Sequence, residues 1–192
     1  MLLEPFSRSA CFSRRLLQYF ELNSNEDRYG SRRAETLEAG IFTSDNIPVQ
    51  ILERNQQYLI KIKVRHNEAM PAAIVAYTIK DPRGVILCGT NTLFQGVDMG
   101  RMNEADLVVV TFRQHIRLNP GKFFLCVGCA NYETGEYVVY DRRFDYMSFE
   151  VVGAQQRAGI AGIFDLDSTI EWAPCAQEGD ALTSNPFDTT QK

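Results

Sequence analysis

The amino-acid sequence predicts an all-β fold, an antiparallel β-sandwich of the immunoglobulin-like or jelly-roll-like kind. Between Gly30 and Val152 apolar residues recur at every second position, which is the period of a half-buried strand rather than of a helix. Turn-forming residues separate these runs at short intervals, and no long helical pattern interrupts them. About seven or eight short strands with such spacing are typical of a sandwich.

The segment Tyr58–Arg65 shows the pattern most clearly, because its apolar residues alternate with mostly cationic ones. The other predicted strands are Glu35–Phe42, Ala72–Lys80, Val85–Cys88, Leu107–Gln114, Lys122–Asn131, Tyr137–Asp141 and Tyr146–Val152. Asp81–Gly84 has proline second and glycine fourth, which suits a type I turn. We interpret Asp141–Arg143 as another turn, in which opposite charges neutralise one another.

One further strand is predicted near the C-terminus, after a linker. Gly159–Leu166 is a compact apolar piece that follows a polar linker, and we predict that it forms one more strand. This strand either completes the sheet of its own chain or is exchanged onto an exposed sheet edge in a dimer. Residues 167–192 are polar and interrupted by proline, which predicts a flexible C-terminal tail with Trp172 as its candidate anchor.

The composition excludes several classes of function. The 192 residues are 45% hydrophobic and 23% charged, as in ordinary globular proteins. The net charge is -4 and no basic stripe is visible, so we expect no nucleic-acid partner. No apolar run approaches the roughly 20 residues that cross a bilayer, so we expect no membrane insertion.

The cysteines and histidines do not predict a metal or cofactor site. The five cysteines follow no regular framework, which favours a reducing compartment. Cys126 and Cys129 form a C-x-x-C pair inside a predicted strand, where residues three apart point to opposite faces and cannot share one metal. His66 and His115 are the only histidines, and no phosphate-binding loop or hydrolase motif is present. We therefore expect no catalysis, no cofactor and no bound metal.

A glycosidase is the remaining enzymatic alternative, because paired carboxylates can hydrolyse glycosidic bonds. The candidates are Asp141, Asp145 and Glu150. The alternation directs Glu150 outward, but the sequence does not give the separation between any two of these carboxylates.

A binding surface is better supported than a catalytic site. In Leu107–Gln114 and the residue after it, the alternation directs Thr111, Arg113 and His115 outward, and in Ala72–Lys80 it directs Thr78 outward. The same alternation directs Ala76 outward, and in Lys122–Asn131 it directs outward Phe124, Cys126, Gly128 and Ala130. The small residues of this set would leave a shallow trough beside the polar groups.

Aromatic residues lie where this trough would end. Tyr132 and Tyr137 follow the strand of small residues, and sugars stack on aromatic rings while their hydroxyls bind polar groups. The predicted carbohydrate-binding residues are Thr78, Thr111, Arg113, His115 and Tyr132. The alternative is that they form only the solvated side of a half-buried sheet.

Several segments together resemble the C-terminal carbohydrate-binding domain of Wzt-type proteins, the ATPase subunits of O-antigen polysaccharide ABC transporters. The segments are Tyr29–Glu35 with Glu38–Phe42, Tyr77–Gly84 with Gly89–Thr92, Asn119–Leu125, Tyr140–Arg143 with Phe149–Gly153, and Gly159–Leu166. Their order and spacing carry the resemblance, which covers roughly residues 29–166.

The resemblance implies a non-catalytic domain that recognises the terminally modified non-reducing end of a lipid-linked O-antigen polysaccharide. Residues 1–28 would be a linker from a preceding nucleotide-binding domain, 29–166 the sandwich, and 167–192 the tail. The protein would act in the cytoplasm, peripheral to the inner membrane, as a homodimer beside the transporter's membrane subunit. The alternative is a structural dimerisation domain of the ATPase without a ligand site.

Overall fold

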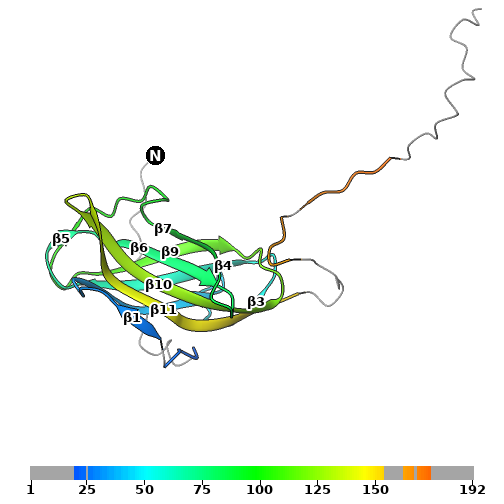
Figure 1. The fold of residues 1–192 in the computed structure, drawn as a ribbon, viewed down its shortest axis with the longest axis horizontal. Coiled ribbons are helices and arrows are strands. Elements are labelled where there is room, and N and C mark those ends of the chain that lie inside the picture. Colours follow the sequence, from blue (N-terminus) through cyan, green and yellow to red (C-terminus); the bar gives the residue numbers. More distant parts are fainter. Residues whose placement is uncertain (1–19, 25, 154–161, 167, 174–192) are drawn as a thin grey trace, which may run out of the picture.

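The chain folds into two facing β-sheets (Figure 1). The computed structural model describes residues 20–24, 26–153, 162–166 and 168–173. Within these ranges all regular structure is strand, and none of it is a helix that could span a membrane. The predicted all-β sandwich is therefore confirmed.

The larger layer is a six-stranded sheet. Its strands are, in spatial order, β1 (Asp27–Tyr29), β11 (Glu136–Val152), β10 (Gly121–Glu133), β6 (Ile74–Lys80) and β7 (Ile86–Asn91), with β3 (Ile51–Glu53) also beside β11. All of these pairings are antiparallel except that of β3, which runs parallel to β11.

The smaller layer is a three-stranded antiparallel sheet. It consists of β2 (Ala34–Phe42), β4 (Gln57–His66) and β9 (Leu107–His115), in that order. The short strands β5 (Met70–Pro71) and β8 (Arg101–Met102) pair with each other.

The core lies between the two sheets and is filled by the inward side of each alternating strand. In the six-stranded sheet Tyr77 pairs with Val127, and in the three-stranded sheet Ile60 pairs with Phe112; all four are buried. The rings of Tyr77 and Phe112 meet edge to face across the sandwich, with centroids 5.1 Å apart. Tyr77 also donates a hydrogen bond from its hydroxyl to Gln114 Oε1 at 2.7 Å, so the two sheets are linked by polar as well as apolar contacts.

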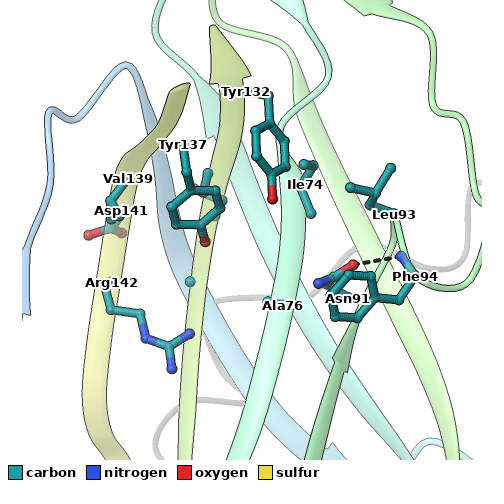
Figure 2. A pocket seen from close by; sticks show the side chains of 13 residues that line it. Ile74, Ala76, Asn91, Leu93, Phe94, Tyr132, Tyr137, Val139, Asp141 and Arg142 are labelled. Atoms are coloured by element: carbon teal, nitrogen blue, oxygen red, sulfur yellow. Dashed lines mark hydrogen bonds between the residues drawn. The ribbon is translucent and has the colours of Figure 1, made fainter. Parts of the chain in front are cut away.

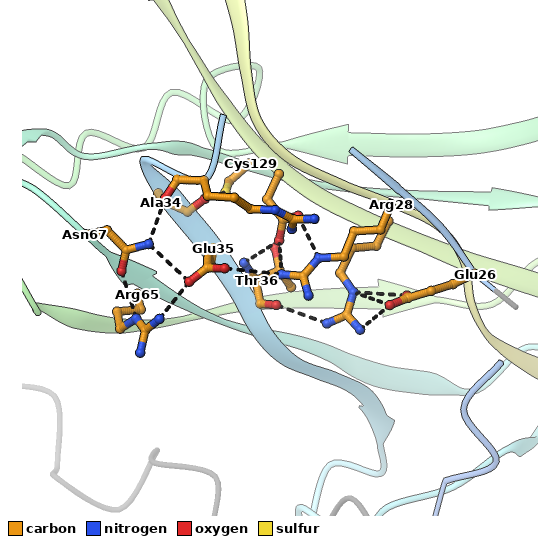
Figure 3. A network of polar contacts seen from close by, with 11 residues as sticks. Glu26, Arg28, Ala34, Glu35, Thr36, Arg65, Asn67 and Cys129 are labelled. Carbon is orange, nitrogen blue, oxygen red and sulfur yellow. Dashed lines mark hydrogen bonds and ion pairs between the residues drawn. The ribbon is translucent and has the colours of Figure 1, made fainter. Parts of the chain in front are cut away.

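The predicted turn at Asp141–Arg143 is wrong. These residues lie inside β11, which runs without a break through both segments that we expected to be separate strands. Asp141 is fully buried and accepts hydrogen bonds from Arg28, Arg32 and the Thr36 backbone amide (Figure 3). Because its compensating charges come from far along the chain, local sequence could not show that this carboxylate belongs inside the sandwich.

The N-terminal edge of the domain contributes contacts that the sequence did not predict. Strand β1 pairs with the middle of β11, so it spans the predicted boundary at residue 28. Phe20 is buried and meets Phe42 of β2 edge to face, with ring centroids 5.6 Å apart. A Cβ atom on Gly40 would lie 2.5 Å from the Phe20 ring, so this position requires glycine as long as Phe20 packs there.

The described part of the C-terminal segment contacts the sandwich through residues 162–166. Of the predicted strand Gly159–Leu166, residues 162–166 are described; Phe164 forms an isolated antiparallel bridge with Leu118, and Asp165 pairs with Arg54. The chain then leads away from the sandwich, and Trp172 is 86% exposed (Figure 1). Trp172 therefore does not anchor the tail on its own chain. Residues 159–161 and 174–192 lie outside the described residues.

Candidate functional site

The outward face of the six-stranded sheet carries a trough with a floor of small residues. Ala76 of β6 lies opposite Gly128 of β10, and Ile74 lies opposite Ala130. Because the small side chains leave space above the sheet, a hollow of about 300 Å³ opens there (Figure 2). The alternation that we read from the sequence placed Ala76, Gly128 and Ala130 on this outward face, and the register confirms it.

Gly128 is required at the floor for a steric reason. A Cβ atom at this position would lie 2.7 Å from the backbone oxygen of Asp141 and 3.1 Å from Cδ of Arg142. Strands β10 and β11 can therefore keep this register only with glycine at position 128. The same glycine keeps the trough open.

Exposed aromatic rings line the rim of the trough. Tyr132 and Tyr137 lie opposite each other across the hairpin of β10 and β11, with ring centroids 5.4 Å apart. They are 56% and 60% exposed, and Phe94, in the loop after β7, is 79% exposed. Large aromatic rings that face solvent beside a hollow indicate a binding surface, since such rings are normally buried.

The polar groups of the trough are mainly hydrogen-bond donors. Asn91 of β7 accepts a hydrogen bond from the Phe94 backbone amide at 2.7 Å through its oxygen, so its NH₂ group is turned toward the trough (Figure 2). Arg142 projects its guanidinium over the floor and donates to Thr78 Oγ1 at 3.2 Å. Partial burial raises the pKa of Tyr137, so its hydroxyl stays protonated at neutral pH.

Comparison with known proteins identifies the family. The family model described as the Wzt C-terminal domain matches residues 25–166. The chain belongs to the Wzt C-terminal domain family. The crystal structure of a Wzt C-terminal domain superimposes with a TM-score of 0.73 at 21% identity, over 82% of this chain and 95% of that one. At this identity the likeness shows the shared fold. Membership makes the chain a non-catalytic carbohydrate-binding domain of an O-antigen transporter.

Two other solved structures resemble the chain only weakly. A β-glucosidase from Listeria innocua matches with a TM-score of 0.35 at 11% identity, over 67% of this chain and 16% of the enzyme. The CARDB domain of a Pyrococcus furiosus protein matches with a TM-score of 0.33 at 12% identity, over 62% of this chain and 90% of that one. Both superpositions are too poor to support an argument. No curated protein matches the chain.

The five predicted binding residues of this Wzt C-terminal domain do not share one face. Thr78 and Tyr132 belong to the six-stranded sheet that carries the trough. Thr111, Arg113 and His115 belong to β9, which pairs with β4 in the other sheet. The expectation of a single surface is wrong, because it assumed that β9 lies beside β6 and β10. Sugar contact stays a prediction for two alternative surfaces, one at Thr78 and Tyr132 and the other along β9.

The predicted binding residues of β9 lie away from the trough, in a different environment. Thr111 and Arg113 line a larger hollow of about 650 Å³ between β7 and β9, whose lining mixes polar side chains such as Gln95 with aliphatic ones such as Val97 and Met99. The His115 ring makes a hydrogen bond to the Asn55 carbonyl at 2.8 Å. No exposed aromatic ring borders this hollow, which makes it a weaker candidate for sugar binding than the trough.

Among the trough residues that the sequence did not predict, Asn91, Phe94 and Arg142 carry the groups most able to contact a ligand. Asn91 and Phe94 lie in or beside the loop that follows β7, where no periodic pattern assigns a face. Arg142 was assigned to a turn, and only the unbroken strand β11 directs it outward. The alternation of β11 could have predicted the outward direction of Arg142, because this residue lies between the inward-facing Asp141 and Arg143.

The cysteine pair behaves as the strand pattern predicts. Cys126 lies on the outward side near Asp145, whereas Cys129 points inward and donates to the Ala34 carbonyl at 3.5 Å. Burial raises the pKa of Cys129 to about 12 and also raises that of Cys126, so both stay thiols at neutral pH. In the described ranges no group of three or more His, Cys, Asp or Glu side chains is placed to hold a metal ion.

The carboxylates considered for a glycosidase are not arranged as a catalytic pair. Asp141 borders the trough, but its carboxylate points away from it toward Arg28 (Figure 2). Asp145 forms an ion pair with Lys80 at 2.7 Å, and Glu150 is exposed near the other end of β11. None of these three carboxylates faces the aromatic rim, so the structure offers no support for glycoside hydrolysis.

Proposed function

We propose that this domain binds the terminally modified non-reducing end of a lipid-linked O-antigen polysaccharide in the trough. The supporting observation is the convergence of exposed aromatic rings and hydrogen-bond donors over a floor of small residues. Tyr132, Tyr137 and Phe94 provide flat apolar faces for the C–H groups of a sugar. Asn91 and Arg142 provide donors for its oxygen atoms.

The dimensions of the trough favour the end of a glycan over its interior. A hollow of about 300 Å³ is at the lower limit of ordinary ligand pockets, which suits one or two sugar units. The hairpin that carries Tyr132 and Tyr137 borders the hollow. A domain that reads the chain end can distinguish a finished polysaccharide from a growing one, and so couple termination to export.

The test is binding of the full chain to O-polysaccharide released from its own organism, measured by isothermal titration calorimetry. Replacing Tyr137→Ala should weaken binding about tenfold, because it removes an aromatic contact worth roughly 1.4 kcal/mol. The matched control is Thr111→Ala together with His115→Ala on the opposite sheet, which should leave the affinity unchanged. Loss of binding in the control variants with none in Tyr137→Ala would move the site to the three-stranded sheet.

The family also suggests where the domain works. We propose that it is part of the transporter's ATPase subunit, in the cytoplasm at the inner membrane, next to the membrane subunit. There a bound glycan end would be held close to the export pathway. Co-purification of the parent ATPase with its membrane subunit from membranes, and not from the soluble fraction, tests this placement.

A second proposed role is homodimerisation, either in addition to glycan binding or as the structural function of a domain without a ligand. It is supported by the exposed apolar side chains of the C-terminal segment, Leu166, Ile170 and Trp172, which are 86–89% exposed on their own chain. Strand β9 lies at the edge of its sheet and offers unpaired backbone groups to such a segment. The mass of the domain in solution tests this role.

A further inference from the structure

We infer that the trough selects a glycan end that carries an anionic group, either a sugar carboxylate or a phosphate ester, and that Arg142 recognises it. This inference rests on the proposed function and names the substrate class of the same site.

Arg142 is a cation without an ionic partner. Its guanidinium donates to Thr78 Oγ1 at 3.2 Å and lies over the Phe144 ring, 5.0 Å from the centroid, but it forms no ion pair with any described carboxylate. These two contacts fix its direction and use one of its five N–H donors. Because Arg142 also lines the trough, its remaining donors are available to form a fork with a carboxylate or a phosphate bound there.

The nearby carboxylates are engaged by other cations. Asp145 pairs with Lys80 at 2.7 Å, and Asp141 pairs with Arg28 at 2.9 Å on the inward side. The next residue, Arg143, forms a fork with Glu26, with N···O distances of 2.5–3.1 Å. Of the two arginines in β11, one is therefore neutralised within the fold, and the one that faces the trough is not.

The other side of the trough has the same polarity. Asn91 presents its NH₂ group, since its oxygen is taken by the Phe94 amide at 2.7 Å. The hydroxyls of Tyr132 and Tyr137 can also donate. A surface of donors around one uncompensated positive charge is complementary to an anion, whereas a neutral sugar hydroxyl would gain only the weaker, uncharged kind of hydrogen bond.

The experiment compares three forms of O-polysaccharide from the source organism in calorimetric titrations of the full chain. The first form is native, the second has its carboxyl groups reduced to alcohols, and the third has its phosphate esters removed with cold hydrofluoric acid. We expect one of the two treatments to weaken binding about 10- to 100-fold, as expected for the loss of a charge-assisted hydrogen bond. The treatment that does so identifies the anion.

Variants connect the effect to Arg142. Arg142→Gln should weaken binding of the native form to the same extent and bind the treated form as the unaltered protein does. Arg142→Lys keeps the charge but loses the fork, so its affinity should be intermediate. The matched control is Arg101→Gln, an exposed arginine of β8 that does not line the trough, which should leave the affinity unchanged.

Three other outcomes would each contradict a different part of the proposal. If both treated polysaccharides bind like the native one, the anion inference is overturned while glycan binding stands. If a treatment weakens binding but Arg142→Gln, folded by circular dichroism, does not, the role of Arg142 is overturned. If the native polysaccharide does not bind at all, the proposed function fails and this inference fails with it.

Discussion

Three consecutive residues of β11 have three different electrostatic environments. Asp141 points inward and is held by two arginines, and Arg143 points inward to Glu26. Arg142 lines the trough and forms no ion pair with any carboxylate in the described part of the chain. The alternation of the strand separates charges that are adjacent in sequence, because neighbouring side chains point to opposite faces. One stretch of chain thereby provides both a structural ion-pair network and a candidate ligand group.

The buried carboxylate of Asp141 should be essential for stability. Asp141→Asn removes the charged acceptor that binds Arg28, Arg32 and the Thr36 amide, which should cost about 1.5–3 kcal/mol of unfolding free energy because Asp141 is fully buried while the two arginines are partly exposed. The control is Asp145→Asn, whose partly exposed pair with Lys80 should be worth at most about 1 kcal/mol. Urea denaturation of both variants measures the difference, and equal losses would contradict the structural role of Asp141.

His66 should make stability depend on pH. Its side chain is fully buried, and its Nε2 accepts a hydrogen bond from the Ala73 amide at 3.1 Å, which requires a neutral ring. Burial lowers the pKa of His66, whereas in the unfolded chain the ring takes up a proton near its ordinary pKa of about 6.5. The domain should therefore lose stability as the pH falls below about 6.5.

This pH dependence can be assigned to one residue by substitution. His66→Gln keeps an acceptor for Ala73 and should flatten the change in urea midpoint between pH 7.5 and 5.5. His115→Gln, at an exposed position, serves as the control and should keep the slope of the unaltered domain. A slope that survives in His66→Gln would show that another group causes it.

At the scale of elements, the N-terminal segment is part of the packed domain. Phe20 packs against β2, and β1 pairs with β11, so residues on both sides of residue 25 contact the sandwich. The Glu26 and Arg28 side chains bind Arg143 and Asp141 of β11 (Figure 3). The segment that leads into the domain is thus attached to the same strand that carries Arg142.

The contact between Phe20 and β2 can be tested by steric coupling. Gly40→Val should displace the Phe20 ring and destabilise the domain by about 1–3 kcal/mol, as overpacking does. In a Phe20→Ala background the same change should cost less, because the ring is no longer there. Additive losses in the double variant, measured by urea denaturation, would mean that the two residues do not contact each other.

At the scale of the whole molecule, the described residues include an edge strand and an apolar segment that a partner could cover. Strand β9 pairs only with β4, and Leu166, Ile170 and Trp172 lie on a segment that leads away from the sandwich (Figure 1). Pairing between two copies would cover both features at once. This is the physical basis of the proposed homodimer.

Substitution of the three apolar residues tests the dimer. The combined change Leu166→Ser, Ile170→Ser and Trp172→Ser should convert the dimer to a monomer in multi-angle light scattering. Deletion from Gly159 onward should do the same. The control is Leu93→Ser with Phe94→Ser, exposed apolar residues at the trough, which should keep the dimer mass and weaken glycan binding. A dimer that survives both C-terminal changes would place the interface elsewhere.

The strands that the sequence predicts are those long enough to show a period. Strands β2, β4, β6, β9 and β10 appear within a few residues of their predicted bounds, and both predicted halves of β11 are present. The sequence did not predict β1, β3, β5 and β8. These strands have two or three residues each, which is too short to show an alternating pattern. Pairing partners, rather than local pattern, create these short strands.

The sequence by itself determined the fold class and the side of its own strand to which most trough residues point, since alternation is a local property. It placed Ala76, Gly128 and Ala130 on an outward face, and Tyr132 and Tyr137 at the end of that face. Only the tertiary structure decided which strands share a sheet. It placed Thr111, Arg113 and His115 on the opposite layer and brought Asn91, Phe94 and Arg142 to the trough. Sheet order depends on contacts between residues far apart in the chain, and no local pattern encodes them.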